Sequence, residues 1–271
     1  MTAATPPFVR EAGQGCPVLC LHSNASSSSQ WRGLMDQLAP RFRVLAPDLL
    51  GAGRSAPWPV VLGARLQHEL DALAPLLLGL GDAPHQRFHL VGHSYGAALA
   101  LAIAQAWPQR VASAVLFEPT AFPLLTRPGP GDPAATGIAA VATAAIAAVD
   151  HGDLPAAAEA FIDYWMGAGS WAAMPEARRG PLADAMRPIR QWTEALFAEP
   201  WTDFGLARMT MPVLLLGGAL SPASASDLLP ILARLLPNAT VQRLEAVGHM
   251  APVTHPHRVN PLIVQWLDGQ A

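Results

Sequence analysis

Five consecutive residues, Gly92-His93-Ser94-Tyr95-Gly96, have the types and spacing of a nucleophilic site. A short apolar run at residues 88–91 predicts a strand before them, and an alanine- and leucine-rich pattern at residues 97–107 predicts a helix after them. The chain must therefore turn sharply at Ser94, and glycines two positions to either side remove side chains that would clash there. This G-x-S-x-G turn presents one hydroxyl group at its tip. The alternative is a serine in an ordinary glycine-bordered turn.

A serine hydroxyl becomes a good nucleophile only when a base takes its proton, and histidine is best suited to this near neutral pH. His249 follows the last predicted strand, at residues 240–246, and so lies at the same sheet edge as Ser94 if the strands are parallel. His22 and His93 are the alternatives. His93 precedes the serine on the turn and should point elsewhere, and His22 ends a strand, where a structural role is common. We therefore expect His249 to be the base.

The elements that must position these residues alternate between strands and helices. Apolar runs predict further strands at residues 8–11, 17–21, 42–47, 111–117 and 211–218. The alternation stops over residues 120–208, which show helical patterns only. The order predicts an α/β fold with a mostly parallel sheet flanked by helices and an all-helical cap insertion. The expected organisation is a core at residues 1–119, a cap at 120–208 and the rest of the core at 209–271.

Composition narrows the possible functions. Half of the 271 residues are apolar, and the net charge is only −3, with basic residues scattered along the chain. This pattern excludes a disordered chain and does not predict binding to nucleic acid. All 17 basic residues are arginine, so Schiff-base chemistry, a pyridoxal-phosphate site and a Walker phosphate loop are excluded. Cys16 and Cys20 have no second Cys/His pair at metal-ligand spacing, so we expect neither a metal nor a cofactor.

The chain shows no predicted membrane segment. Its first eleven residues lack the basic start and apolar run of a signal peptide. The longest weakly apolar run, at residues 134–149, is mostly alanine and is expected to be too short and too mild to span a bilayer. We therefore expect a soluble cytoplasmic protein without a membrane partner. The sequence leaves open whether it is a monomer or a dimer.

Two loops follow predicted strands. The serine-rich loop at residues 22–31 precedes an amphipathic helix and offers backbone N–H groups to an anion. Residues 51–56 formally fit the dinucleotide pattern G-x-G-x-x-A. Pro57 and Pro59 stand where the phosphate-binding helix would have to run, so this interpretation is rejected. Asp48, at the start of that loop, is expected to be a structural hydrogen-bond partner rather than a catalytic residue.

These motifs together resemble the α/β-hydrolase family over nearly the whole chain. The resemblance rests on the G-x-S-x-G turn, the loops at residues 22–31 and 48–55, and Gly248-His249-Met250. The dehalogenase and esterase branches of that family have a similar histidine-led loop with Asn followed by small residues and then Trp-Arg. The resemblance implies a core sheet of about eight strands with the helical cap above the nucleophile.

The acidic partner of the histidine departs from the commonest pattern of that family. The pattern has an aspartate in a Gly-x-x-Asp turn after the seventh strand, and here the turn ends in Ser221, which is neutral. Asp227 falls inside the following helix and is expected to be too far along to reach His249. Glu118 follows the strand at residues 111–117, which comes after the predicted helix at residues 97–107. Some dehalogenases of the family use this position for the acid. The alternative for Glu118 is a salt bridge or a hydrogen-bonded strand end.

The oxyanion of an acyl-transfer reaction needs at least two donors. The backbone N–H of Tyr95 follows the nucleophile directly, and we expect the backbone N–H of Asn24 to supply the second. Asn24 could also donate through its side chain, as in halide-binding relatives. Dehalogenation requires a carboxylate nucleophile, however, and position 94 is serine.

The expected function is a cofactor-free serine hydrolase that cleaves small hydrophobic carboxylic esters through an acyl-enzyme. Large apolar side chains are frequent in the predicted cap, which favours a hydrophobic acyl or aromatic substrate. Hydrolysis of a carbon–carbon bond, a lactone or a thioester is the main alternative, because the same site can serve all of them. A ligand-binding protein that keeps the fold without turnover is the alternative outside enzymes. Aromatic residues concentrated in the predicted cap include Phe161, Tyr164, Trp165, Trp171, Trp192, Phe197 and Trp201.

Overall fold

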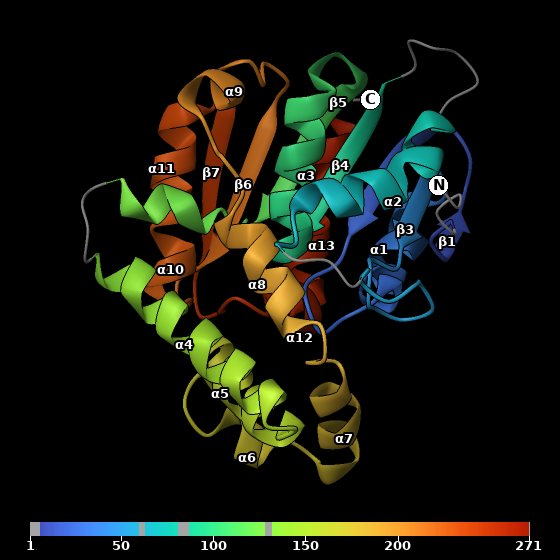
Figure 1. The fold of residues 1–271 in the computed structure, drawn as a ribbon. Helices are drawn as coiled ribbons and strands as arrows, with labels where there is room; N and C mark the ends of the chain where they lie inside the picture. Colours follow the sequence, from blue (N-terminus) through green and yellow to red (C-terminus); the bar gives the residue numbers. More distant parts are fainter. Residues whose placement is uncertain (1–5, 60–62, 81–86, 128–131, 271) are drawn as a thin grey trace.

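The computed structural model describes residues 6–59, 63–80, 87–127 and 132–270. These residues form a mostly parallel sheet of seven strands in the order β1-β3-β2-β4-β5-β6-β7, in which β1 alone runs antiparallel to its neighbour β3 (Figure 1). The predicted fold class is confirmed, although about eight strands were expected. The strands are β1 (Val9–Ala12), β2 (Cys16–Leu21), β3 (Phe42–Pro47), β4 (Phe88–His93), β5 (Val111–Phe117), β6 (Val213–Gly218) and β7 (Ala239–Leu244).

Alternate residues of the central strands pack into different hydrophobic cores. In β2, Leu19 and Leu21 belong to the larger core, and Val18 and Cys20 belong to the smaller core on the opposite face. All four side chains are fully buried. A parallel sheet covered on both faces needs such continuous apolar strands, which explains why the central strands read as apolar runs.

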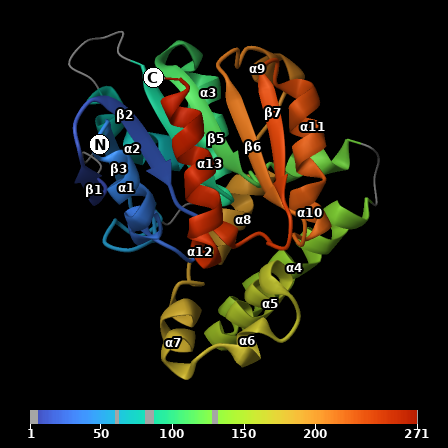
Figure 2. The same ribbon diagram turned by 180° about the vertical axis from the view of Figure 1, so that it is seen from behind.

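Helices cover both faces of the sheet (Figures 1 and 2). Helices α1 (Arg32–Leu38) and α13 (Pro256–Asp268) supply apolar side chains to the smaller core, and α2 (Leu66–Leu78), α3 (Tyr95–Ala106) and α11 (Leu228–Leu235) supply the larger one. The shorter helices outside the segment between β5 and β6 are η1 (Ser28–Trp31), η2 (Pro108–Arg110), α10 (Ala223–Ser226) and α12 (Ala251–Thr254).

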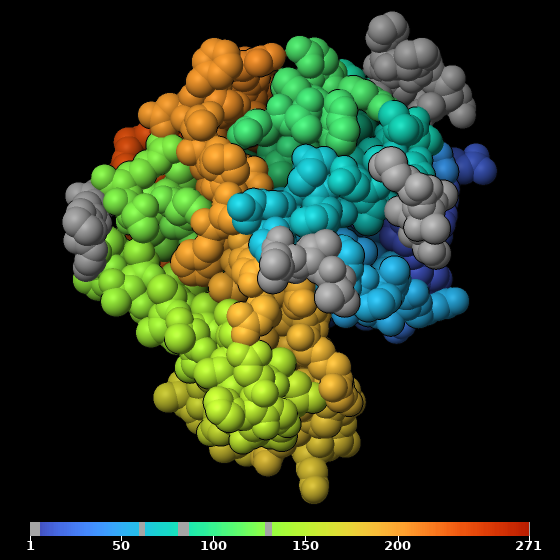
Figure 3. Space-filling view, viewed as in Figure 1, coloured from blue at the N-terminus to red at the C-terminus, as the bar shows by residue number. Residues whose placement is uncertain are grey.

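The described residues between β5 and β6 contain helices and no strand, as the sequence predicts for this segment. Part of the segment, α4 to α7, extends beyond one end of the sheet as a lobe (Figures 1 and 3). The exact limits of a cap domain stay a prediction. The helices are η3 (Phe122–Thr126), α4 (Pro133–Asp150), α5 (Leu154–Met166), α6 (Ser170–Ala173), α7 (Glu176–Asp184), α8 (Ile189–Phe197) and α9 (Asp203–Ala207).

Helix α4 is longer than the sequence suggested. Among the described helices it alone is long and apolar enough to cross a membrane by length and composition, contrary to the prediction that this run is too short and too mild. Those two criteria are weak evidence, because a core helix of a soluble protein meets them as well. In this structure α4 packs against α5 and α8.

The register of the parallel strands brings distant residues to one edge of the sheet. His93 pairs with Phe117, and Phe117 pairs with Leu216, so Ser94 and Glu118 follow at the same level on neighbouring strands. The Ser94 N–H donates to the Phe117 carbonyl at 2.9 Å, which extends the β4–β5 ladder into the turn. The carboxyl ends of parallel strands thus form the platform on which the candidate site is built.

Candidate active site

Ser94 lies at a sharp turn between β4 and α3. Its backbone has φ 56° and ψ −116°, a conformation that non-glycine residues rarely adopt. A Cβ atom on Gly92 would lie 2.5 Å from the Ala97 Cα, and one on Gly96 would lie 2.2 Å from the Leu21 carbonyl oxygen. Both glycines are therefore required by the turn that the sequence predicts. Backbone strain of this kind costs roughly 1–3 kcal/mol and is characteristic of functional sites.

His249 contacts the hydroxyl group of Ser94. It lies in the loop between β7 and α12, and its Nε2 atom is 2.9 Å from Ser94 Oγ. Both residues are buried: His249 is 2 % exposed and Ser94 is 6 % exposed. The structure thus brings together two residues that are 155 positions apart in the chain.

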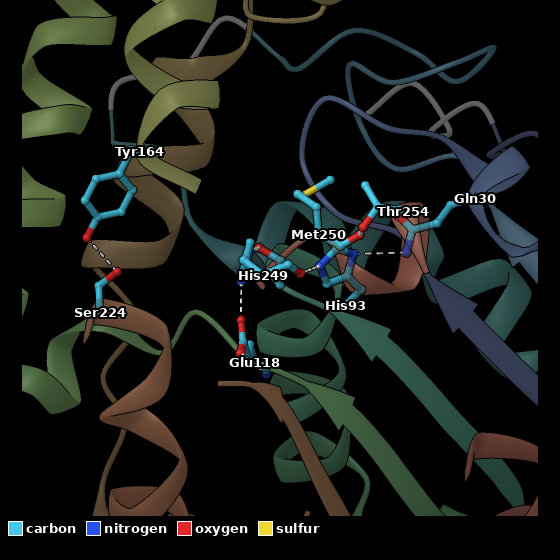
Figure 4. Close-up of polar contacts among 10 residues, drawn as sticks. Gln30, His93, Glu118, Tyr164, Ser224, His249, Met250 and Thr254 are labelled. Atoms are coloured by element: carbon cyan, nitrogen blue, oxygen red, sulfur yellow. Dashed lines mark hydrogen bonds and ion pairs between the residues drawn. The ribbon is translucent and has the colours of Figure 1, made fainter. Parts of the chain in front are cut away.

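Glu118 contacts the other nitrogen of the same imidazole. Its Oε2 atom lies 2.6 Å from His249 Nδ1, and its Oε1 atom accepts a hydrogen bond from the Gly218 N–H at 2.7 Å (Figure 4). A carboxylate only accepts hydrogen bonds, so Nδ1 of the neutral imidazole carries the proton and Nε2 is free to accept from Ser94. The carboxyl group is fully buried, and a buried charge needs such partners.

The turn after β6 holds no acidic partner for His249. Its Gly218 donates to Glu118, and its Ser221 Oγ is buried without a hydrogen-bond partner. Asp227 accepts a hydrogen bond from the Ser226 hydroxyl and is exposed. The expectation that neither Ser221 nor Asp227 partners His249 agrees with these contacts.

His93 has a structural contact with the candidate base. Its Nε2–H donates to the backbone carbonyl of His249 at 2.9 Å, and its Nδ1 accepts from the Gln30 side chain at 3.1 Å (Figure 4). Burial and the neighbouring His249 hold the pKa of His93 well below its ordinary value, so the ring stays neutral. Both nitrogens of His93 are occupied, and neither faces Ser94.

His22 and Asp48 hold neighbouring loops in place. His22 Nδ1–H donates to the Ser23 carbonyl at 2.7 Å, its Nε2 accepts from the Leu49 N–H at 3.0 Å, and burial lowers its pKa to about 4. Asp48 accepts from the backbone N–H groups of Ser28 at 2.7 Å and Arg54 at 2.8 Å. These contacts fit the structural roles expected for both residues.

Ser94 lines a small cavity of about 30 Å³. The other polar residues in its lining are Asn24, Thr120 and Thr193. The described residues that line it include no charged side chain. The apolar lining comes from η3, α4, α5 and α8, namely Phe122, Ile138, Val141, Ala142, Phe161, Trp165, Ile189, Leu196 and Phe197. The apolar lining favours a small, mostly apolar ligand.

Residues 17–256 match the model of the alpha/beta hydrolase fold family. The chain is an α/β hydrolase. Lipase LipV of Mycobacterium tuberculosis is 32 % identical over 262 residues, which cover 91 % of this chain and 91 % of that protein. The 2-hydroxymuconate semialdehyde hydrolase of Pseudomonas sp. is 34 % identical over 113 residues, which cover 40 % of this chain and 38 % of that protein. A thermophilic esterase from Thermogutta terrifontis superposes with a TM-score of 0.73 at 25 % identity, over 97 % of this chain and 93 % of that one.

One expected oxyanion donor of the hydrolase, Tyr95, follows Ser94 in the chain, and the other, Asn24, lines the same cavity as Ser94. Tyr95 is the first residue of α3, and the first N–H groups of a helix have no partner within the helix. Thr120 also lines the cavity, and its buried hydroxyl has no partner in the structure. Among the described residues of the hydrolase, no group of three or more His, Cys, Asp or Glu side chains could hold a metal ion.

Glu69 lies behind the site and was not singled out from the sequence. It sits on α2, fully buried, and accepts from the Tyr95 hydroxyl and from the Leu50 N–H, both at 3.1 Å. Burial raises its pKa to about 8. The signal was present, because Glu69 lies at helical spacing from the apolar residues Leu66 and Leu73 and therefore on the buried face of the α/β hydrolase's second helix.

Trp165 contacts the candidate base, a role that its spacing in the sequence does not reveal. Its ring stacks on the His249 imidazole with the centroids 4.0 Å apart and the planes at 26°. The indole is 5 % exposed and its Nε1–H has no hydrogen-bond partner. The sequence of the hydrolase predicts an aromatic-rich cap, but it does not show which of its rings contacts the base.

Proposed function

We propose that this α/β hydrolase cleaves small hydrophobic carboxylic esters through an acyl-enzyme formed on Ser94. The observation that supports this most directly is the continuous hydrogen-bonded chain from Ser94 through His249 to Glu118, which opens onto an apolar cavity. This is the arrangement that activates a serine for acyl transfer. The lipase and esterase relatives support the same reaction class.

In the proposed mechanism, Ser94 Oγ attacks the ester carbonyl carbon while its proton moves to His249 Nε2. Glu118 holds the imidazole in the tautomer that accepts this proton, and it offsets the charge that forms on the ring. The backbone N–H groups of Tyr95 and Asn24 bind the oxyanion. When the C–O bond to the alcohol breaks, His249 returns the proton to the leaving oxygen. Water then attacks the acyl carbonyl carbon while His249 Nε2 takes its proton. The bond to Ser94 Oγ breaks, and His249 returns the proton to the serine.

The test is hydrolysis of p-nitrophenyl butyrate by the purified protein and two serine variants. Ser94→Ala should lose activity entirely, because no nucleophile remains. Ser221→Ala is the matched control: it removes another buried hydroxyl at the same sheet edge and should retain activity. Equal loss from both variants would contradict the assignment.

Two further measurements separate the alternatives. Labelling of the wild type by a fluorophosphonate, with no labelling of Ser94→Ala, would distinguish a hydrolase from a ligand-binding protein whose serine is inactive. A panel of esters, thioesters, lactones and vinylogous diketones would separate ester cleavage from carbon–carbon cleavage. The muconate semialdehyde hydrolase relative keeps carbon–carbon cleavage as the second candidate, supported over the 40 % of this chain that it matches.

A further inference from the structure

Gln30 connects two parts of the candidate site through its side-chain amide. Its Oε1 atom accepts from the Ser23 N–H at 3.2 Å and from the Ser23 hydroxyl at 3.1 Å. Its Nε2 group donates to His93 Nδ1 at 3.1 Å (Figure 4). His93 Nε2–H in turn donates to the His249 carbonyl at 2.9 Å. A continuous chain of hydrogen bonds therefore runs from the loop that carries Asn24 to the backbone of the candidate base.

The two ends of this chain fix the direction of its hydrogen bonds. A backbone N–H can only donate, and a backbone carbonyl can only accept. The Ser23 N–H therefore requires the amide oxygen of Gln30, and the His249 carbonyl requires the His93 proton on Nε2. Nδ1 of His93 is then an acceptor, and the NH2 group of Gln30 satisfies it. One side chain must thus accept at one atom and donate at another, which an amide does and a carboxylate does not.

The Ser23 end of the chain holds the peptide unit of the expected oxyanion donor. The Ser23 carbonyl and the Asn24 N–H belong to the same planar peptide unit. His22 Nδ1–H donates to this carbonyl at 2.7 Å, and Gln30 binds the N–H and the hydroxyl of Ser23. The residue after Asn24, Ala25, has φ 53°, a strained conformation that persists only where the surroundings hold it. Gln30 therefore helps to fix the direction of the Asn24 N–H.

The short helix η1 holds Gln30 itself in place. Trp31, the last residue of η1, is buried in the smaller core, and the Ser28 N–H donates to Asp48 at 2.7 Å. Gln30 lies outside the described lining of the cavity at Ser94, so it is not among the groups that would contact a substrate there. An effect of Gln30 on turnover must therefore pass through the residues that it holds.

We propose that Gln30 is a positioning residue that fixes the oxyanion donor Asn24 and the base His249 relative to each other. This inference rests on the proposed ester hydrolysis. The two groups act in the same transition state, because Asn24 binds the developing oxyanion while His249 carries the proton taken from Ser94. A misplacement of about 1 Å can lower turnover roughly a hundredfold. Loss of the Gln30 hydrogen bonds should therefore lower kcat and leave KM nearly unchanged.

Two variants interrupt the chain in different ways. Gln30→Met keeps the length of the side chain and removes both polar groups. Gln30→Glu keeps an acceptor for Ser23 but replaces the NH2 group by a carboxylate oxygen, which cannot donate to His93 Nδ1. Both should lower kcat for p-nitrophenyl acetate about tenfold to a hundredfold with little change in KM. Gln105→Met is the matched control, because it removes another half-buried amide, whose Oε1 has no hydrogen-bond partner.

Two further measurements separate positioning from folding. Titration with a fluorophosphonate counts the reactive serines, and the fall in kcat should persist when kcat is expressed per titrated site. The rate constant of this labelling should fall together with kcat, since labelling needs the same base and the same oxyanion donor. The double variant Gln30→Met/His93→Leu should have about the kcat of the more affected single variant, because both substitutions interrupt one chain.

Four results would overturn the inference. One is a kcat of Gln30→Met or Gln30→Glu equal to that of Gln105→Met. Another is a loss that appears in KM alone, and a third is a fall in kcat that disappears per titrated site. The last is that the separate effects of Gln30→Met and His93→Leu multiply in the double variant. A wild type that neither hydrolyses esters nor reacts with the fluorophosphonate would instead contradict the proposed function, and this inference with it.

Discussion

The buried carboxyl group of Glu69 predicts that the protein loses stability as the pH rises. Burial raises its pKa from 4.5 to about 8. One pKa unit corresponds to about 1.4 kcal/mol, so the largest possible contribution to the free energy of unfolding is about 5 kcal/mol. The sign follows from linkage: the folded state favours the protonated carboxyl, so the contribution is fully present below pH 4.5 and is lost as the pH rises through 8.

The variant Glu69→Gln isolates this contribution. The amide stays neutral at every pH. Its oxygen can accept from the Leu50 N–H as a Glu69 oxygen does, and its NH2 group can donate to the Tyr95 hydroxyl oxygen, which reverses the direction of the wild-type hydrogen bond. Integrating the linkage relation between pH 6 and pH 9, the wild type should lose about 3 kcal/mol of stability relative to Glu69→Gln. The pH range begins at 6 because other carboxyl groups titrate below it.

The assay is urea unfolding at pH 6, 7, 8 and 9, followed by tryptophan fluorescence and circular dichroism. The difference in unfolding free energy between Glu69→Gln and the wild type should grow across this range. Glu159→Gln, which removes an exposed carboxyl group of α5, is the control and should follow the wild type. If the unfolding free energies of the wild type and Glu69→Gln changed in parallel with pH, the reasoning would be refuted. Such a result would mean that burial does not raise the pKa of the Glu69 carboxyl group.

Three further predictions concern the candidate site. Glu118→Gln should lower kcat for p-nitrophenyl butyrate about ten-thousandfold, because the amide cannot hold the imidazole tautomer, while circular dichroism stays unchanged. Gly96→Ala should lower the Tm markedly in thermal unfolding, since its Cβ would lie 2.2 Å from a backbone oxygen of β2, whereas Gly180→Ala, with open space at that position, should not. His93→Leu removes a donor to the backbone of the candidate base, and stopped-flow kinetics should show a lower kcat with little change in KM.

Much of the fold could be predicted because its signals are local. The strand-turn-helix at Ser94 is fixed by two glycines whose neighbours leave no space for a side chain. The placement of Glu118 beside His249 could also be predicted, since both residues follow strands and parallel strands end at one edge. The number of strands was overestimated, because the figure of about eight came from the resemblance, whereas the apolar runs of this chain indicate seven.

The contacts made by the helical segment could not be predicted in the same way. Helical patterns place Trp165 and Trp171 in helices of the cap segment, but the rotation of each helix relative to the sheet is a tertiary property. That rotation places Trp165 on the His249 imidazole, whereas the Trp171 ring packs under the guanidinium group of Arg179. The hydrogen bond of Glu69 could not be predicted for a related reason. Its donor, the Tyr95 hydroxyl, is distant in sequence and reaches Glu69 only in the folded protein.

The sheet positions the reacting groups, and the helices between β5 and β6 form most of the cavity walls. Ser94 and Glu118 directly follow strands, so their positions are set by the ladders of the sheet, and His249 is held to this edge by contacts with both. The walls of the cavity at Ser94 come mostly from α4, α5 and α8. Substitutions in those helices can therefore change which ester fits without displacing the reacting groups. Trp165 is the exception, because it is a cavity wall that also contacts the base. For this reason we expect replacement of Trp165 to change both kcat and selectivity, and replacement of the other wall residues of these helices to change selectivity alone.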